Sequence, residues 1–434
     1  MSLAAGTDLS CGPEYASLTK AVEQGLVAEA QVDTALARLL RARFRLGMLD
    51  PPERLPFPAA RPDAPPARTV IDAADHRALA VGAAQKSLVL LKNAGGVLPL
   101  RKDLGTIAVI GPNADDVDLL LGNYNGLPTD PVTPLEGIPA VPDPRAREEA
   151  LEAARQADAV VLLLGLSPRL EGEEMPVDVP GFRGGDRVSL DLPAPQQELL
   201  EAVVAAGKPV VLVLLNGSAL AITWAADHVP AILEAWYPGQ AAGDAIADVL
   251  FGDANPAGRL PVTFYRSVAQ LPPFDDYAMR GRTYRYFTGE PLFPFGHGLS
   301  YAAFAYQDLR VPADVRAGDT VRVSVDVRNT GARAGDDVVQ LYVTDEESTV
   351  PVPVRTLAGF QRVSLAARER RTVVFAVAPR YLSVVDDRGE RVIEPGTFVI
   401  SVGGKQPGFS GVADAHTTGV VSATFRVRNG SPRP

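Results

Sequence analysis

Three glutamates crowd into one loop of the sequence: Glu171, Glu173 and Glu174, with Gly172 among them. Like-charged carboxylates held close together cannot all ionise easily, and a group kept protonated in this way can act as a general acid. An acidic loop rich in glycine and proline is also a common solvated surface feature. These residues alone therefore leave both interpretations open, a proton-transfer site and a solvated loop.

The loop spans residues 165–192 and directly follows an apolar segment at residues 159–164. Two further apolar segments, at residues 210–215 and 231–236, alternate with helical patterns in the same part of the chain. Continuous apolar strands between helices predict a mostly parallel sheet covered on both faces. In such sheets ligands bind beyond the carboxyl ends of the strands, which is where the glutamate loop begins.

The flanking regions have other patterns. Residues 1–55 contain two amphipathic segments, at 18–26 and 31–46, which predict helices. Residues 56–68 are rich in proline and alanine and predict a linker. The α/β domain is expected at residues 69–300, as an α/β/α sandwich.

The last part of the chain, residues 301–434, changes to a hydrophobic period of two. Residues 320–328 read T-V-R-V-S-V-D-V-R, with apolar and polar positions in alternation. Several short strands of this kind without a helical pattern predict a β-sandwich.

Composition excludes several classes of function. The net charge of −10 argues against nucleic acid as a partner, and no apolar run reaches the length of a membrane span. The four histidines lie far apart without metal-ligand spacing, and no G-x-G-x-x-G or P-loop motif is present, so neither a metal nor a cofactor is expected. Cys11 is the single cysteine and can form no internal disulfide.

The chain resembles glycoside hydrolase family 3, in the bacterial β-xylosidase and β-glucosidase branch. The resemblance rests on the glutamate loop, with G-G-D-R downstream, and on further motifs that follow in the family's order along nearly all of the chain. They are A-G-T-D-L-S-C-G (5–12), R-F-R-L-G-M-L-D-P-P (43–52), G-N-Y-N-G (122–126), L-L-N-G-S (214–218), W-Y-P-G-Q (236–240), G-R-L-P-V-T-F (258–264), R-T-Y-R-Y-F (282–287) and F-P-F-G-H-G-L-S-Y (293–301).

The resemblance implies three domains: a (β/α)₈ barrel, an α/β sandwich and a fibronectin type III-like β-sandwich. Residues 1–55 would be the helical remnant of the barrel, which needs ~250 residues. It further implies that Glu173 is the catalytic acid/base of a retaining exo-β-glycosidase, with Glu171 as the alternative. The family's aspartate nucleophile belongs to a barrel motif without a counterpart here, and Cys11 would pair with a cysteine beside it.

Other residues are candidates for sugar contacts. Tyr124 and Asn125 lie in a loop that would border the site, although N-Y-N-G is also a common turn. Arg282 and Tyr284 combine a cation with an aromatic ring, which suits sugar binding, although alternating aromatics also pack strands. Asp186 and Arg187 are expected to fix the loop as an ion pair.

The expected substrate is a β-linked oligosaccharide or an aryl glycoside with a terminal β-xylosyl or β-glucosyl residue. The alternative is a catalytically inactive fragment that serves as an assembly or carbohydrate-binding module. The apolar faces of the helices expected in residues 1–55 would then be exposed, and self-association through them is expected. No secretion signal is visible after Met1, and localisation is left open.

Overall fold

The computed structural model has two units, Met1–His76 and Arg77–Pro434. It describes residues 2–54, 72–123, 126–138, 147–172, 175–184 and 186–429. The linker expected at residues 56–68 lies outside these ranges.

The first unit is helical, as the amphipathic segments predicted. Its helices are η1 (Pro13–Ser17), α1 (Leu18–Glu23), α2 (Glu29–Arg45) and η2 (Pro52–Arg54). In α2 only Ala35 is buried, whereas Leu36, Leu40 and Phe44 are exposed along one side of the helix. An apolar stripe of this kind is typical of an interaction surface.

The thiol of Cys11, in the same unit, is exposed and free, so it is not a buried core residue.

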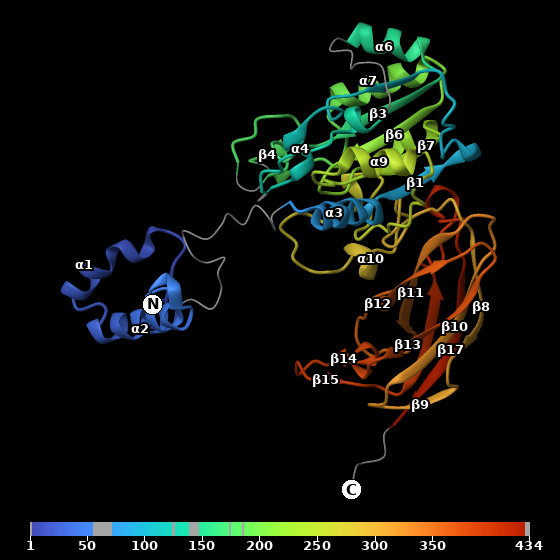
Figure 1. The fold of residues 1–434 in the computed structure, drawn as a ribbon. Helices are drawn as coiled ribbons and strands as arrows, with labels where there is room; N and C mark the ends of the chain where they lie inside the picture. The colour runs from blue at the N-terminus through green and yellow to red at the C-terminus, as the bar shows by residue number, and fades with distance from the viewer. Residues whose placement is uncertain are drawn as a thin grey trace. The chain divides into compact units, whose positions relative to one another are not determined.

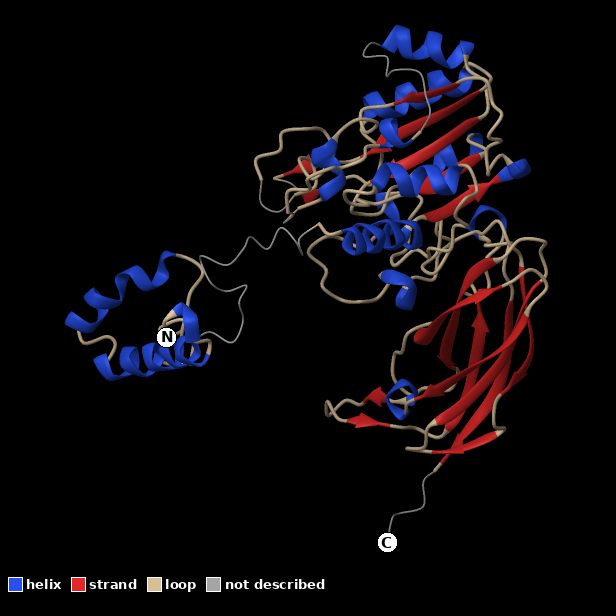
Figure 2. Cartoon of the chain, viewed as in Figure 1, coloured by secondary structure: helices blue, strands red, loops and turns tan. Residues whose placement is uncertain are grey.

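A five-stranded sheet forms the centre of the α/β domain in the second unit (Figures 1 and 2). The strands are β1 (Val89–Asn93), β2 (Ile107–Ile110), β3 (Ala159–Gly165), β6 (Val210–Leu215) and β7 (Ala231–Glu234). Their order is β1-β7-β6-β3-β2, and all neighbours are parallel except the antiparallel pair β1 and β7. The prediction of a mostly parallel sheet is confirmed.

Helices cover both faces of this sheet because every central strand is apolar on both sides. The helices of the domain are α3 (Ala74–Ser87), α4 (Val117–Leu121), α5 (Pro134–Gly137), α6 (Arg147–Gln156), α7 (Ala194–Ala205), α8 (Thr223–His228), α9 (Ala242–Leu250) and, beside the β-sandwich, α10 (Thr283–Tyr286). Val161 and Leu163 of β3 belong to one core with residues of α3, α4 and α9. Leu162 and Leu164 belong to the opposite core, with residues of α6, α7 and α8.

The C-terminal domain is a β-sandwich, as the period of two predicted. Its strands are β8 (Phe304–Arg310), β9 (Asp314–Arg316), β10 (Val321–Asn329), β11 (Gly335–Asp345), β12 (Thr356–Leu365), β13 (Arg370–Val377), β16 (Gly396–Gly403) and β17 (Val420–Arg428). One sheet has the order β13-β10-β8 and the other β12-β11-β16-β17-β9. A hairpin of β14 (Val384–Val385) and β15 (Arg391–Val392) extends from them.

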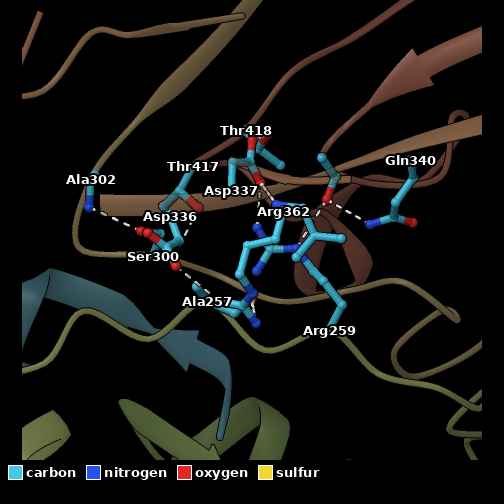
Figure 3. Close-up of polar contacts among 12 residues, drawn as sticks. Ala257, Arg259, Ser300, Ala302, Asp336, Asp337, Gln340, Arg362, Thr417 and Thr418 are labelled. Carbon is cyan, nitrogen blue, oxygen red and sulfur yellow. Dashed lines mark hydrogen bonds and ion pairs between the residues drawn. The ribbon is translucent and has the colours of Figure 1, made fainter. Parts of the chain in front are cut away.

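A buried ion pair joins the β-sandwich to the α/β domain (Figure 3). Nη2 of Arg259 lies 2.6 Å from Oδ1 of Asp337, and the two side chains are 6% and 0% exposed. Oδ2 of Asp337 also accepts hydrogen bonds from the hydroxyls of Tyr306 and Thr418, each at 2.8 Å. The Arg259 guanidinium donates further to the carbonyls of Gly258 and Gly404. Such extra hydrogen bonds are what make a buried ion pair tolerable.

His297 lies in the same junction as a hydrogen-bonded structural residue. Its Nε2 lies 2.9 Å from the carbonyl oxygen of Leu91, so this nitrogen carries the proton of the neutral ring. Burial lowers the pKa of His297 to about 4, and the ring is therefore uncharged beside the Arg259 cation at neutral pH.

Replacing Arg259 with alanine tests how much the buried ion pair contributes to the stability of the fold. Arg259→Ala leaves the Asp337 carboxylate buried without its cation, and we expect the free energy of unfolding to fall by about 3–5 kcal/mol. Urea unfolding of the whole chain, followed by circular dichroism, measures the loss. Arg428→Ala is the matched control, since its pair with Asp314 is exposed (68% and 42%) and is expected to contribute about 0–1 kcal/mol. Equal losses of unfolding free energy in the two variants would contradict the stabilising role of the buried ion pair.

The exposed stripe of α2 leads to a second expectation, that the chain self-associates. Light scattering should show a mean mass that rises with protein concentration. Combined Leu40→Glu and Phe44→Glu substitutions should shift the mass toward the monomer, because charges on the stripe oppose apolar contact. Arg45→Glu, on another side of α2, should leave association unchanged. A wild-type chain that stays monomeric at all concentrations would refute this expectation.

Candidate active site

The carboxyl ends of β3, β6 and β7 meet at one edge of the sheet, and a glycine allows their close approach. Gly165 ends β3 with φ 135°, and a Cβ at this position would lie 2.1 Å from the carbonyl oxygen of Leu215 in β6. Gln196 of α7 fixes the same point, since its side-chain amide bonds both the N–H and the carbonyl of Gly165. The chain therefore leaves β3 in a defined direction into the glutamate loop.

Glu171 ties this loop to the ends of the two neighbouring strands. Its Oε1 accepts a hydrogen bond from the N–H of Gly217 (2.5 Å) and another from the hydroxyl of Tyr237. Its Oε2 accepts one from the hydroxyl of Ser218 (2.5 Å). Gly217 and Ser218 follow β6, and Tyr237 follows β7. One carboxylate thus connects three strand ends, and hydrogen bonds to a charged acceptor are the stronger kind.

Arg187 completes the network from β5 (Asp186–Arg187), which pairs with β4 (Phe182–Arg183) farther along the same loop. Its Nη1 donates to the hydroxyl of Ser218 (2.9 Å) and to the carbonyl of Ala219 (2.5 Å). Burial lowers the pKa of Arg187, and the charge of Glu171 acts in the opposite direction. The ion pair expected between Asp186 and Arg187 is wrong. Arg187 fixes the loop instead through partners that follow β6.

Tyr237 stays protonated in this environment. Burial raises the pKa of its hydroxyl, and the neighbouring Glu171 charge raises it further. The hydroxyl therefore acts as a hydrogen-bond donor to Glu171 at any physiological pH. This residue belongs to the W-Y-P-G-Q motif, but its role could be assigned only once the strand ends were seen together.

A second glutamate, Glu234, lies beneath the network at the end of β7. It is fully buried, with Oε1 3.0 Å from the N–H of Trp236 and Oε2 3.3 Å from Nδ2 of Asn216. Burial raises the pKa of Glu234 well above its usual range and so favours the neutral form of its carboxyl. Sequence reasoning missed both Glu234 and Asn216. The available signal was a carboxylate inside an otherwise apolar strand.

The structure places only some of the candidates from the sequence. Glu173, Glu174, Tyr124 and Asn125 lie outside the described residues, and their roles stay predictions. Glu171 lies at the carboxyl edge of the sheet, where the glutamate loop was expected.

Arg282 and Tyr284 are fixed by other contacts. Nη2 of Arg282 donates to the carbonyl oxygens of Pro273 (2.9 Å) and Asp276 (2.5 Å). The ring of Tyr284 stacks on Phe295 with centroids 4.2 Å apart. No hydrogen bond or ring contact joins either residue to Glu171 within the described ranges. Tyr284 belongs to the helical turn α10 and not to a strand, but it does pack on strands: its ring contacts Tyr342 of β11, and its hydroxyl accepts a hydrogen bond from the N–H of Leu357 in β12.

The described part of the chain offers no group of three or more His, Cys, Asp or Glu side chains placed to hold a metal ion. Its helices are also too short or too polar to cross a bilayer. The groups that the structure places at the edge of the sheet are carboxyls, a guanidinium, a phenol and backbone N–H groups.

Comparisons with known proteins agree with this arrangement. Residues 88–301 match the model of the glycosyl hydrolase family 3 C-terminal domain, and residues 337–406 match that of a fibronectin type III-like domain. A β-xylosidase of Formosa agariphila is 40% identical over 86% of this chain and 53% of its own length. A periplasmic β-glucosidase of Salmonella typhimurium is 35% identical over 93% of this chain and 58% of its own.

Solved structures give the same result. A β-glucosidase of Erythrobacter marinus matches with a TM-score of 0.81 and 34% identity, over 98% of this chain and 59% of the other. A family 3 exo-β-xylosidase in complex with a xylobiose aziridine probe matches with a TM-score of 0.82 and 28% identity, over 98% and 57%. The chain spans about half to two thirds of the length of these relatives. The matches of its two domains and the similarity to these relatives show that the chain belongs to glycoside hydrolase family 3.

Proposed function

We propose that this chain supplies the general acid/base of a retaining exo-β-glycosidase that removes terminal β-xylosyl or β-glucosyl residues. The observation that carries the proposal is the anchoring of the glutamate loop by Glu171 at the carboxyl edge of the sheet. An acid/base must be held in place while it gives and takes a proton, and a loop fixed at its base meets this need.

Glu173 is the proton donor in this proposal and Glu171 is its positioning residue. Both oxygens of Glu171 already accept hydrogen bonds from protein groups, and a glycosidic oxygen would have to displace one of them. Glu173 follows two residues later and belongs to the same loop. It would protonate the leaving oxygen first and then deprotonate the water that attacks the glycosyl intermediate.

The nucleophile of the reaction is expected outside the 434 residues. Retaining glycosidases need two carboxyl groups ~5–5.5 Å apart, one of which attacks the sugar. The family's Ser-Asp-x-x-Gly motif does not occur in this sequence. The relatives that this chain resembles are named as β-xylosidases and β-glucosidases, which supports this substrate class.

A chimera tests the two roles. The part of the Formosa agariphila β-xylosidase that precedes the matched region would be joined to this chain and assayed with aryl β-xylosides. Glu173→Gln should lower kcat/KM for a poor leaving group by roughly 10²–10⁴-fold, because proton donation is lost. For an aryl leaving group that departs without protonation, kcat/KM of the Glu173→Gln variant should stay near the wild-type value. Azide attacks the glycosyl intermediate without a general base, so it should restore the turnover of this variant.

Two further variants give the contrast. Glu174→Gln removes the same charge from the next position. It should change kcat/KM by no more than a few-fold, for poor and good leaving groups alike. Glu171→Gln should slow poor and good leaving groups alike, without rescue by azide, because it disturbs the loop and not the proton transfer itself. Dependence on the leaving group and azide rescue in Glu171→Gln, with neither in Glu173→Gln, would reverse the assignment.

The chain by itself should not hydrolyse aryl β-xylosides or β-glucosides above the rate in buffer, since the covalent route needs a nucleophile that it does not contain. Release of nitrophenol by the pure 434-residue chain measures this directly. Turnover that Glu173→Gln abolishes would contradict the expectation. Turnover that Glu173→Gln leaves intact would point to a contaminating enzyme.

A further inference from the structure

A cavity of about 440 Å³ lies between α10 and the β-sandwich, and no role has been assigned to it. Its lining includes Tyr284 and Arg285 of α10, Asp345 at the end of β11, and Arg391 of β15. Arg380 and Tyr381 come from η7 (Pro379–Leu382). The volume lies within the range of small-ligand sites, roughly 300–1,000 Å³.

Three arginines line this cavity without a carboxylate partner among the described residues. Arg380 donates to the hydroxyl of Tyr381 (3.1 Å), and Arg391 donates to the hydroxyl of Ser383 (2.9 Å). Nε of Arg285 is buried and has no hydrogen-bond partner in the described structure.

Some arginines elsewhere in the β-sandwich do have carboxylate partners. Arg370, Arg371, Arg388 and Arg428 each form an ion pair with a carboxylate. Three guanidiniums without a carboxylate partner thus gather around one cavity, and guanidinium groups are the side chains best suited to bind a planar carboxylate.

The cavity also contains groups that suit hydroxyls and a ring face. The carboxylate of Asp345 accepts only the N–H of Glu347 (3.1 Å) in the described structure and has acceptor capacity left. Burial raises the pKa of Asp345, and the nearby Glu394 and Glu347 raise it further. Tyr284 and Tyr381 add aromatic surface to the lining. A purely inorganic anion would use the arginines and leave these groups without a function.

We propose that this cavity binds an acidic sugar unit, with a uronate carboxylate on the arginines and sugar hydroxyls on Asp345. The choice of a sugar as the carrier of the carboxylate rests on the proposed function, since a glycosidase meets saccharides. The site itself stands apart from the glutamate loop, because no residue of the Glu171 network lines it. It would let the protein hold an acidic substituent of a polysaccharide while neutral sugar residues are processed elsewhere.

Titration calorimetry of the full 434-residue chain with sodium D-glucuronate tests the site, with D-glucose and inorganic phosphate as comparison ligands. Glucuronate should bind, glucose should bind more weakly by roughly tenfold or more, and phosphate should also be weaker. The combined Arg380→Gln and Arg391→Gln variant should lose affinity for glucuronate by roughly tenfold or more. These two side chains are exposed enough to be replaced without loss of the fold.

Arg388→Gln is the matched control. Arg388 lies in the loop between β14 and β15, is 76% exposed, pairs with Asp386 and does not line the cavity. This variant removes a positive charge close by and should leave the affinity unchanged.

Three outcomes would overturn the proposal. They are equal losses in the Arg388 and the double variants, phosphate binding as tight as that of glucuronate, and no binding of glucuronate at all. None of these measurements involves hydrolysis, so failure here is distinguishable from failure of the proposed acid/base role.

Discussion

The parallel alignment of β3, β6 and β7 is the constraint on which the candidate site depends. Each strand is buried on both faces, so polar residues can enter the chain only where a strand ends. Parallel strands end at the same edge, and this brings Glu171, Ser218 and Tyr237 together although 66 residues separate the first from the last. A half-buried polar group at such an edge must find partners. The edge therefore becomes a connected network and not a set of separate side chains.

A different interaction governs the other half of the molecule. The ion pair between Arg259 and Asp337 is buried at both ends and surrounded by hydroxyl and carbonyl partners (Figure 3). Because its geometry is satisfied only in one arrangement, it fixes the β-sandwich on the α/β domain. In that arrangement Arg285 of α10 and Asp345 of β11 line the same cavity. One polar network thus positions the glutamate loop, and a second one positions the arginine-lined cavity.

Hydrophobic period predicted the sheet, its covering helices and the β-sandwich, because burial leaves a direct mark on sequence spacing. It predicted the placement of the glutamate loop for the same reason. It could not predict Glu234, since a single carboxyl inside an apolar strand has no period. It also suggested a wrong partner for Arg187: adjacent residues of a strand point to opposite faces, and the actual hydroxyl partner, Ser218, is 31 residues away. Contacts between distant strand ends are set by topology, which local spacing does not encode.

The two described glutamates of the site differ in burial. Glu234 lies under the sheet edge, where desolvation raises the pKa of its carboxyl and favours the neutral form. Glu171 lies nearer the surface, where three donors bind its oxygens and the Arg187 cation lies nearby. An ionised Glu234 would repel the Glu171 carboxyl and weaken the anchor of the loop. The burial of Glu234 therefore protects the anchor that Glu171 gives to the loop.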